Sequence, residues 1–248
     1  MRLATTVLIV SAIAHGAATA QTPPAPAAAA RTVIAATKLP TVNDKPVRFR
    51  AVSVTIAPGA RNEITTVDGV LYQMSGSTEV SVGGETKTLG AGEGIFIAAG
   101  KSASLAAKGS EPSTSIHFML APAAEGAATA PSASAGTREL YRTAGPIPDL
   151  KAGTHDLNLT RVTFPAHMPS NAPHHRTGAA LYYVLSGTGA NTVEGKAEAR
   201  GPGSFIYEPA GLVHQWGNPG DTPLTFLTFN INQEGVPAVA PDRPATSQ

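Results

Sequence analysis

The side chains best suited to chemistry are concentrated in the second half of the chain. Five of the seven histidines lie between residues 155 and 214, whereas the first half holds only His15 and His117. Imidazole and carboxylate groups bind divalent transition metals. The chain contains no cysteine, so it offers no thiolate ligand, no thiol nucleophile and no disulfide. Any metal would therefore bind to His, Asp, Glu, Tyr or backbone oxygen, and we expect the chemistry in the second half.

One motif in this half has a specific spacing. Gly203 is followed after five residues by Pro209, then by Gly211, by His214 after two more residues and by Asn218 after three more. This pattern resembles the second signature of the cupin superfamily at every fixed position. From the composition of the chain, the chance of such a match is on the order of one in several thousand. The Pro-Gly turn would end one strand and begin another that directs His214 into a barrel.

The first signature of the same family, a Gly followed by His-x-His, Glu and a second Gly, is matched only in part. Anchored on Gly187, it places the glutamate at Ala180 and the two histidines at His174 and Arg176. A spacing longer by one residue would use His175 instead. The resemblance therefore supports two of the four metal ligands typical of the family. Because neighbouring residues of a strand face opposite sides, His174 and His175 are not expected to bind one ion together.

The resemblance implies one divalent transition metal, either iron, manganese, nickel, copper or zinc. The candidate ligands are His174, His175 and His214. Tyr182 and Glu208 are the candidates for a completing oxygen ligand and for catalysis, since Tyr182 shares a strand face with position 180 and Glu208 precedes the turn. Without a metal, the histidines would be hydrogen-bonded members of a pocket.

Three residues are candidates for substrate binding. In the place of the second histidine, Arg176 would point a guanidinium into the barrel, where it could bind a carboxylate or phosphate. Trp216, the only tryptophan, lies two residues after His214 and shares its inward face, and Tyr182 lies on a neighbouring strand. Core packing of Trp216 and exposure of Arg176 at a strand edge are the alternatives.

The elements that must position these residues read as short strands. Only 14% of the residues are charged, whereas glycine (25) and proline (21) are abundant, which is typical of all-β proteins with tight turns. Residues 70–76 align with residues 181–187, an offset of 111, and glycines recur at the same offset. We expect an all-β protein of two double-stranded β-helix (cupin) barrels in tandem, the first without a metal motif.

The N-terminus has the order of a secretory signal peptide: Arg2, an apolar run over residues 3–14, and Ala18-Thr19-Ala20. Cleavage after Ala20 would give a periplasmic or secreted protein that no longer contacts the membrane. The mature chain would carry 17 basic and 17 acidic residues, which argues against nucleic acid as a partner. The expected divisions are signal peptide 1–20, Ala/Pro linker 21–31, first barrel 32–120, linker 121–136, second barrel 137–235 and flexible tail 236–248.

The resemblance implies a function only as a class, because cupins include dioxygenases, decarboxylases, isomerases and ligand-binding proteins. The sequence favours an exported bicupin that is a metal-dependent, dioxygenase-like oxidoreductase acting on a small aromatic or phenolic molecule. The alternative is a non-catalytic cupin that binds a small acid through Arg176 without metal. The expected partners are this small molecule and, at most, a second copy of the chain.

Overall fold

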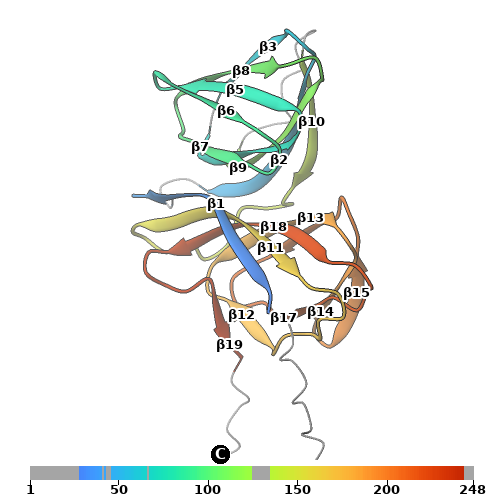
Figure 1. Cartoon of the computed structure of the whole chain (residues 1–248). Coiled ribbons are helices and arrows are strands. Elements are labelled where there is room, and N and C mark those ends of the chain that lie inside the picture. The colour runs from blue at the N-terminus through green and yellow to red at the C-terminus, as the bar shows by residue number, and fades with distance from the viewer. Residues whose placement is uncertain (1–27, 41, 43–45, 66, 125–134, 243–248) are drawn as a thin grey trace, which may run out of the picture.

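The computed structural model describes residues 28–40, 42, 46–65, 67–124 and 135–242, which form nineteen β-strands and no helix. The strands pair into four sheets, and Figure 1 shows them as two barrels stacked one above the other. The prediction of an all-β fold is confirmed. Among the described residues, no helix is long and apolar enough to cross a membrane.

The first barrel has two sheets. The sheet that faces the second barrel has the strand order β10 (Ala135–Arg142), β2 (Val47–Ile56), β9 (Ser113–Pro122), β4 (Gly69–Ser75) and β7 (Gly94–Ile97). The outer sheet has the order β3 (Arg61–Thr65), β8 (Ser102–Lys108), β5 (Ser77–Val82) and β6 (Glu85–Leu89).

The second barrel repeats this plan. Its inner sheet has the order β1 (Ala30–Leu39), β11 (His155–Phe164), β18 (Leu224–Gln233), β13 (Ala179–Ser186) and β16 (Phe205–Glu208). Its outer sheet has the order β15 (Lys196–Arg200), β14 (Gly189–Val193), β17 (Val213–Gly217), β12 (His174–Arg176) and β19 (Val239–Pro241).

The strand register repeats with the offset seen in the sequence. Leu71 of β4 lies opposite His117 of β9, and 111 residues later Tyr182 of β13 lies opposite Thr228 of β18. The hairpin turns after β5 and β14 also correspond, since both central residues of each turn have a positive φ. Two-residue turns of this kind match the twist of the flanking strands. The two barrels therefore share strand order, register and turn geometry.

The two barrels exchange their first strands, which corrects the expected domain boundaries. β1 pairs along its length with β11 of the second barrel, from Ala30 opposite Thr163 to Leu39 opposite His155. β10 pairs with β2 of the first barrel. Each strand covers backbone groups of a neighbour that would otherwise be an open sheet edge. Residues 32–39 therefore belong to the second barrel rather than the first, and residues 137–142 belong to the first.

Smaller boundaries also differ from expectation. Residues 121–122 and 135–136, expected in the linker between the barrels, lie in β9 and β10. Residues 30 and 31, expected in the linker, are already in β1, and residues 239–241 of the expected tail form β19, which pairs with β12. The expected signal peptide lies outside the described residues.

Alternation along the inner strands gives each inner sheet two buried faces. One face of each packs on the other barrel in a shared core that includes Phe49, Phe118 and Phe229, with the ring of Phe229 5.5 Å from Phe49 and 6.0 Å from Phe118. The other face points into its own barrel. The first barrel interior is closed by aliphatic residues such as Val80 and Leu105, whereas the second contains Tyr182 and Trp216. The second barrel is therefore the one whose interior is lined by aromatic side chains.

Candidate functional site

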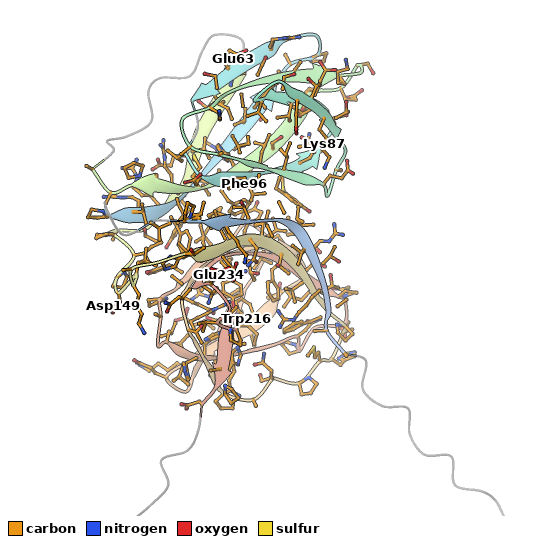
Figure 2. The ribbon with its side chains drawn as sticks, turned by 90° about the vertical axis from the view of Figure 1, so that its left-hand side faces the viewer. Glu63, Lys87, Phe96, Asp149, Trp216 and Glu234 are labelled. Atoms are coloured by element: carbon orange, nitrogen blue, oxygen red, sulfur yellow. The ribbon has the colours of Figure 1, made fainter. Side chains whose placement is uncertain are left out.

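A cavity of about 690 Å³ lies inside the second barrel. The interior faces of β11 and β18 provide Asn158 and Asn230, and β12 provides His174. Tyr182 and Trp216 form the aromatic wall, and Figure 2 shows Trp216 within this barrel. β1 and β19 provide the remaining walls. The cavity is large enough for a small organic molecule.

The motif around Pro209 has a structural explanation. Gly203 and Gly211 have left-handed φ values of 85° and 78°, which glycine adopts without strain. The backbone NH of Gly211 donates to the carbonyl of Arg176 at 2.8 Å, which ties the turn to β12. The side-chain amide of Asn218 donates to the carbonyls of Pro165 and Thr222, each at 2.9 Å. These contacts position the strands, so of the motif's residues only His214 is free for chemistry.

Glu208 is the centre of a fully buried polar cluster. It lies directly opposite Ala180 in the pairing of β13 with β16, so its carboxylate enters from the strand next to the expected glutamate position. Its Oε2 accepts a hydrogen bond from Nε of Arg176 at 3.0 Å, and its Oε1 accepts one from Nε1 of Trp216 at 3.1 Å. Nε2 of His214 lies 3.1 Å from Oε2. The carboxylate is therefore held by a cation and an indole.

Arg176 is buried in the interior of the barrel, and its guanidinium is extensively bonded. Besides the bond to Glu208, Nη1 donates to Oδ1 of Asn230 at 3.1 Å and Nη2 donates to the hydroxyl of Tyr182. Its guanidinium carbon lies 5.0 Å from the centre of the Tyr182 ring, within range of a cation–π contact. Burial lowers the pKa of Arg176, and the charge of Glu208 opposes this effect. Arginine nevertheless stays protonated in proteins, so this site carries a fixed positive charge.

His174 and His214 are neighbours across β12 and β17, with ring centres 4.3 Å apart. Their Nδ1 atoms lie 2.9 Å from the carbonyl of Ala172 and 3.1 Å from that of Leu212. Because a carbonyl only accepts, each Nδ1 carries a hydrogen, so in the neutral form of either ring the lone pair is on Nε2. Nε2 of His214 is buried and, despite its proximity to Glu208, is not aligned for a hydrogen bond within the described residues. Burial is the main cause that lowers the pKa of His214.

The structure thus brings together six of the seven residues singled out from the sequence. These are His174, Arg176, Tyr182, Glu208, His214 and Trp216. His175 is the exception and corrects the set of three histidine ligands. It lies opposite Val213, whose side chain is exposed, because residues next to each other on β12 face opposite sides of the sheet.

Sequence reasoning missed three residues of the cavity. Asn230 bonds to Arg176, Asn158 accepts a bond from the Asn230 amide at 2.9 Å, and Arg31 lines the cavity from β1. A signal for the asparagines existed, since polar residues at 228, 230 and 232 alternate with apolar ones along β18. No such signal existed for Arg31, because its role depends on the strand exchange.

The metal implied by the family resemblance does not fit the residues present. His174 and His214 are oriented as metal ligands usually are, because ligand histidines donate their other NH to a carbonyl or carboxylate. The other two ligand positions are Ala180 and Arg176, and the nearest carboxylate already accepts a bond from the guanidinium. The described residues contain no group of three or more His, Asp or Glu side chains arranged to hold an ion. The charge of Arg176 would also repel a metal cation at this point.

Comparison with known proteins identifies this part of the chain. Residues 160–230 match a family model described as a cupin domain. The second barrel is a cupin domain. A curated relative, mannose-1-phosphate guanylyltransferase ManC of Salmonella typhimurium, is 30% identical over 90 residues, which are 36% of this chain and 18% of that protein. The chain thus matches less than a fifth of the relative's length.

Solved structures extend the cupin likeness to both barrels. AerE from Microcystis aeruginosa superposes with a TM-score of 0.53 and 16% identity, covering 78% of this chain and 96% of that one. Oxalate decarboxylase from Bacillus subtilis, whose Mn(II) centres were studied, superposes with a TM-score of 0.55 and 16% identity, covering 83% and 74%. At such identities the likeness concerns the fold. The predicted class of tandem cupin barrels is confirmed.

Proposed function

We propose that the second cupin barrel binds a small aromatic acid in its cavity without using a metal ion. The observation that carries this proposal is the buried pair of Arg176 and Glu208, which puts a fixed cation where the family has a ligand histidine. A guanidinium neutralises a carboxylate permanently, so the cluster is complete without an added cation. The whole chain would then be a bicupin in which only the second barrel binds a ligand.

The walls of the cavity suit a ring with polar substituents. Tyr182 and Trp216 stack with ring centres 5.4 Å apart, and Trp216 and Phe226 stack at 5.1 Å, giving an apolar wall. Asn158 and Asn230 also line the cavity, and Asn230 lies four residues after Phe226 on β18. An aromatic ring would lie against the aromatic wall and direct its polar groups toward the asparagines.

The metal-dependent, dioxygenase-like oxidoreductase is the second candidate. The observation in its favour is the pair of Nε2 lone pairs on His174 and His214, fixed in direction by their carbonyl partners. A metal at this pair would need oxygen ligands from water or substrate, since Glu208 is bound by Arg176.

Binding can be measured through Trp216, the only tryptophan, because it lines the cavity. We expect benzoate, 4-hydroxybenzoate, phenylacetate or cinnamate to change its fluorescence, with the same dissociation constant before and after treatment with a chelator. Purified protein should contain far less than one transition metal ion per chain. Binding that is lost with chelator and restored by one metal would favour the second candidate. His214→Ala would then abolish binding as well.

Export remains a proposal that follows from the N-terminal sequence. If the signal peptide is cleaved after Ala20, the mature protein begins at Gln21. Mass spectrometry of periplasmic or secreted material should give the mass of residues 21–248. Protein that retains Met1, or that stays with the membrane fraction, would contradict this proposal.

A further inference from the structure

We propose that Arg31, carried by the exchanged strand β1, binds the acidic group of the ligand and determines the preference for anions. This inference rests on the proposed function and assigns its charge recognition to a residue outside the cupin motifs. β1 is the edge strand of the inner sheet, and its residues Arg31, Val33, Ala36, Thr37 and Lys38 line the cavity.

The backbone of β1 explains how Arg31 faces the cavity. The register of β1 on β11 shifts between Val33 and Ala35, which indicates a β-bulge. Before the bulge Arg31 and Val33 line the cavity, and after it Ala36, Thr37 and Lys38 do, while Ile34 and Ala35 pack on the core between the barrels. The bulge thus lets one strand contribute to both the shared core and the cavity wall.

The charges around the cavity single out Arg31. The charge of Arg176 is balanced by Glu208, and Lys38 pairs with Glu234. Asp156, the acidic residue in the cavity lining, lies opposite Lys38, at the other end of β1 from Arg31. Arg31 has no ion pair among the residues that the structure describes. The charge of Arg31 also contributes to lowering the pKa of Arg176. The two guanidinium groups are therefore close enough to repel each other. A ligand carboxylate near Arg31 would relieve this repulsion and form a charge-assisted hydrogen bond.

The surroundings of Arg31 fit the entrance of a ligand site. Val33 and Val239 also line the cavity, yet 62% and 38% of their surfaces are exposed. They are two of the four large hydrophobic residues that are exposed in the described part of the chain. An apolar rim beside an unpaired cation suits a ligand with an apolar body and one negative group. The rim comes from β1 and β19, which belong to opposite ends of the sequence.

The test compares acids with their uncharged amides on the full mature chain. The probes are benzoate, phenylacetate and cinnamate with the corresponding primary amides, measured by Trp216 fluorescence at low ionic strength. We expect the wild type to bind the acids more tightly than the amides. Arg31→Gln should weaken acid binding roughly tenfold to a hundredfold and leave amide binding within about twofold, because a charge-assisted bond contributes this much. Arg31→Lys should recover part of the affinity.

Arg61→Gln is the matched control, because Arg61 is an exposed arginine on the outer sheet of the first barrel. It removes the same charge and should change neither affinity. If Arg31→Gln keeps the full preference for acids, the inference is wrong while ligand binding stands. If neither acids nor amides bind to the wild type, with or without chelator, the proposed function and this inference both fail.

Discussion

Arginine at position 176 determines what the second barrel can hold. The family signature has a glutamate at the position of Ala180, and in this protein Glu208 on the neighbouring strand brings a carboxylate to the same place. Its partner, however, is the guanidinium of Arg176 and not a metal ion. The alternative reading from the sequence used Arg176 as the anchor for an acid. Its bonds to Glu208, Asn230 and Tyr182 instead make it part of the cavity floor.

Removing the charge of Glu208 should strongly destabilise the protein. Glu208→Gln leaves the buried guanidinium of Arg176 without a counter-ion, and breaking a buried pair in this way costs about 3–5 kcal/mol. Urea unfolding at pH 7 measures the loss. The double variant Arg176→Met with Glu208→Gln removes both charges and keeps an acceptor for Trp216, so it should recover at least half. A single variant as stable as the wild type would show that the buried guanidinium does not depend on Glu208 as its counter-ion.

His117 should make the stability dependent on pH. Burial, with a smaller effect of the Arg50 charge, lowers the pKa of His117 to about 4, from about 6.5 in the unfolded chain. At a pH between these two pKa values, His117 is protonated in the unfolded state and neutral in the folded state. The contribution of this residue to the free energy of unfolding should therefore fall by about 3 kcal/mol as the pH falls from 7 to 4.

The comparison that isolates this effect is His117→Leu, which fills the same interior without a titrating group. Urea unfolding of both proteins between pH 4 and 7 should give curves that separate below pH 6.5, with the variant losing less stability. Parallel curves over this range would mean that His117 is protonated in the folded protein or accessible to water.

At the scale of elements, alternation and turn chemistry made the strands predictable. Polar and apolar residues alternate from 157 to 160 and from 227 to 232, and the glycines mark the turns between strands. The partner of each edge strand was not predictable. An alternating strand fits either open edge equally well, and β1 pairs with a strand more than 100 residues away. For the same reason the cavity residues on β12, β13 and β17 could be proposed, whereas Asn158 on β11 was missed and Arg31 on β1 could not be proposed.

Substitutions in the turn after β13 test whether the two barrels share the same turn geometry. Gly187 has a φ of 75°, and a Cβ atom there would lie 2.5 Å from the carbonyl oxygen of Pro223. Gly59 has a similar φ of 72° but open space around it. Gly59→Ala should cost about 1 kcal/mol for the left-handed backbone alone.

Gly187→Ala must in addition move the backbone of the neighbouring strand, so it should cost at least about 2 kcal/mol more. Thermal unfolding of the two variants gives the comparison directly. Gly76→Ala, at the matching position of the first barrel, should behave like Gly187→Ala because its Cβ would lie 2.4 Å from the Pro112 oxygen. Equal losses for Gly59→Ala and Gly187→Ala would contradict this account.

At the scale of the whole molecule, the barrels are joined by more than the chain between them. Their inner sheets share one hydrophobic core, and each half of the sequence donates an edge strand to the other half's sheet, as Figure 1 shows for β1 and β10. A ligand site in the second barrel thus depends on a strand from the first half of the chain.

The exchange predicts how the chain behaves when it is divided. Fragments 28–124 and 135–242 each lack an edge strand and expose one face of the shared core, so neither should fold alone. Expressed together, they should associate into a complex of one copy each with the β-sheet circular dichroism of the intact chain. Gel filtration and circular dichroism of the single and combined fragments check this. A second fragment that is monomeric and folded by itself would show that β1 is dispensable, and its cavity would then lack the arginine that we assign to anion binding.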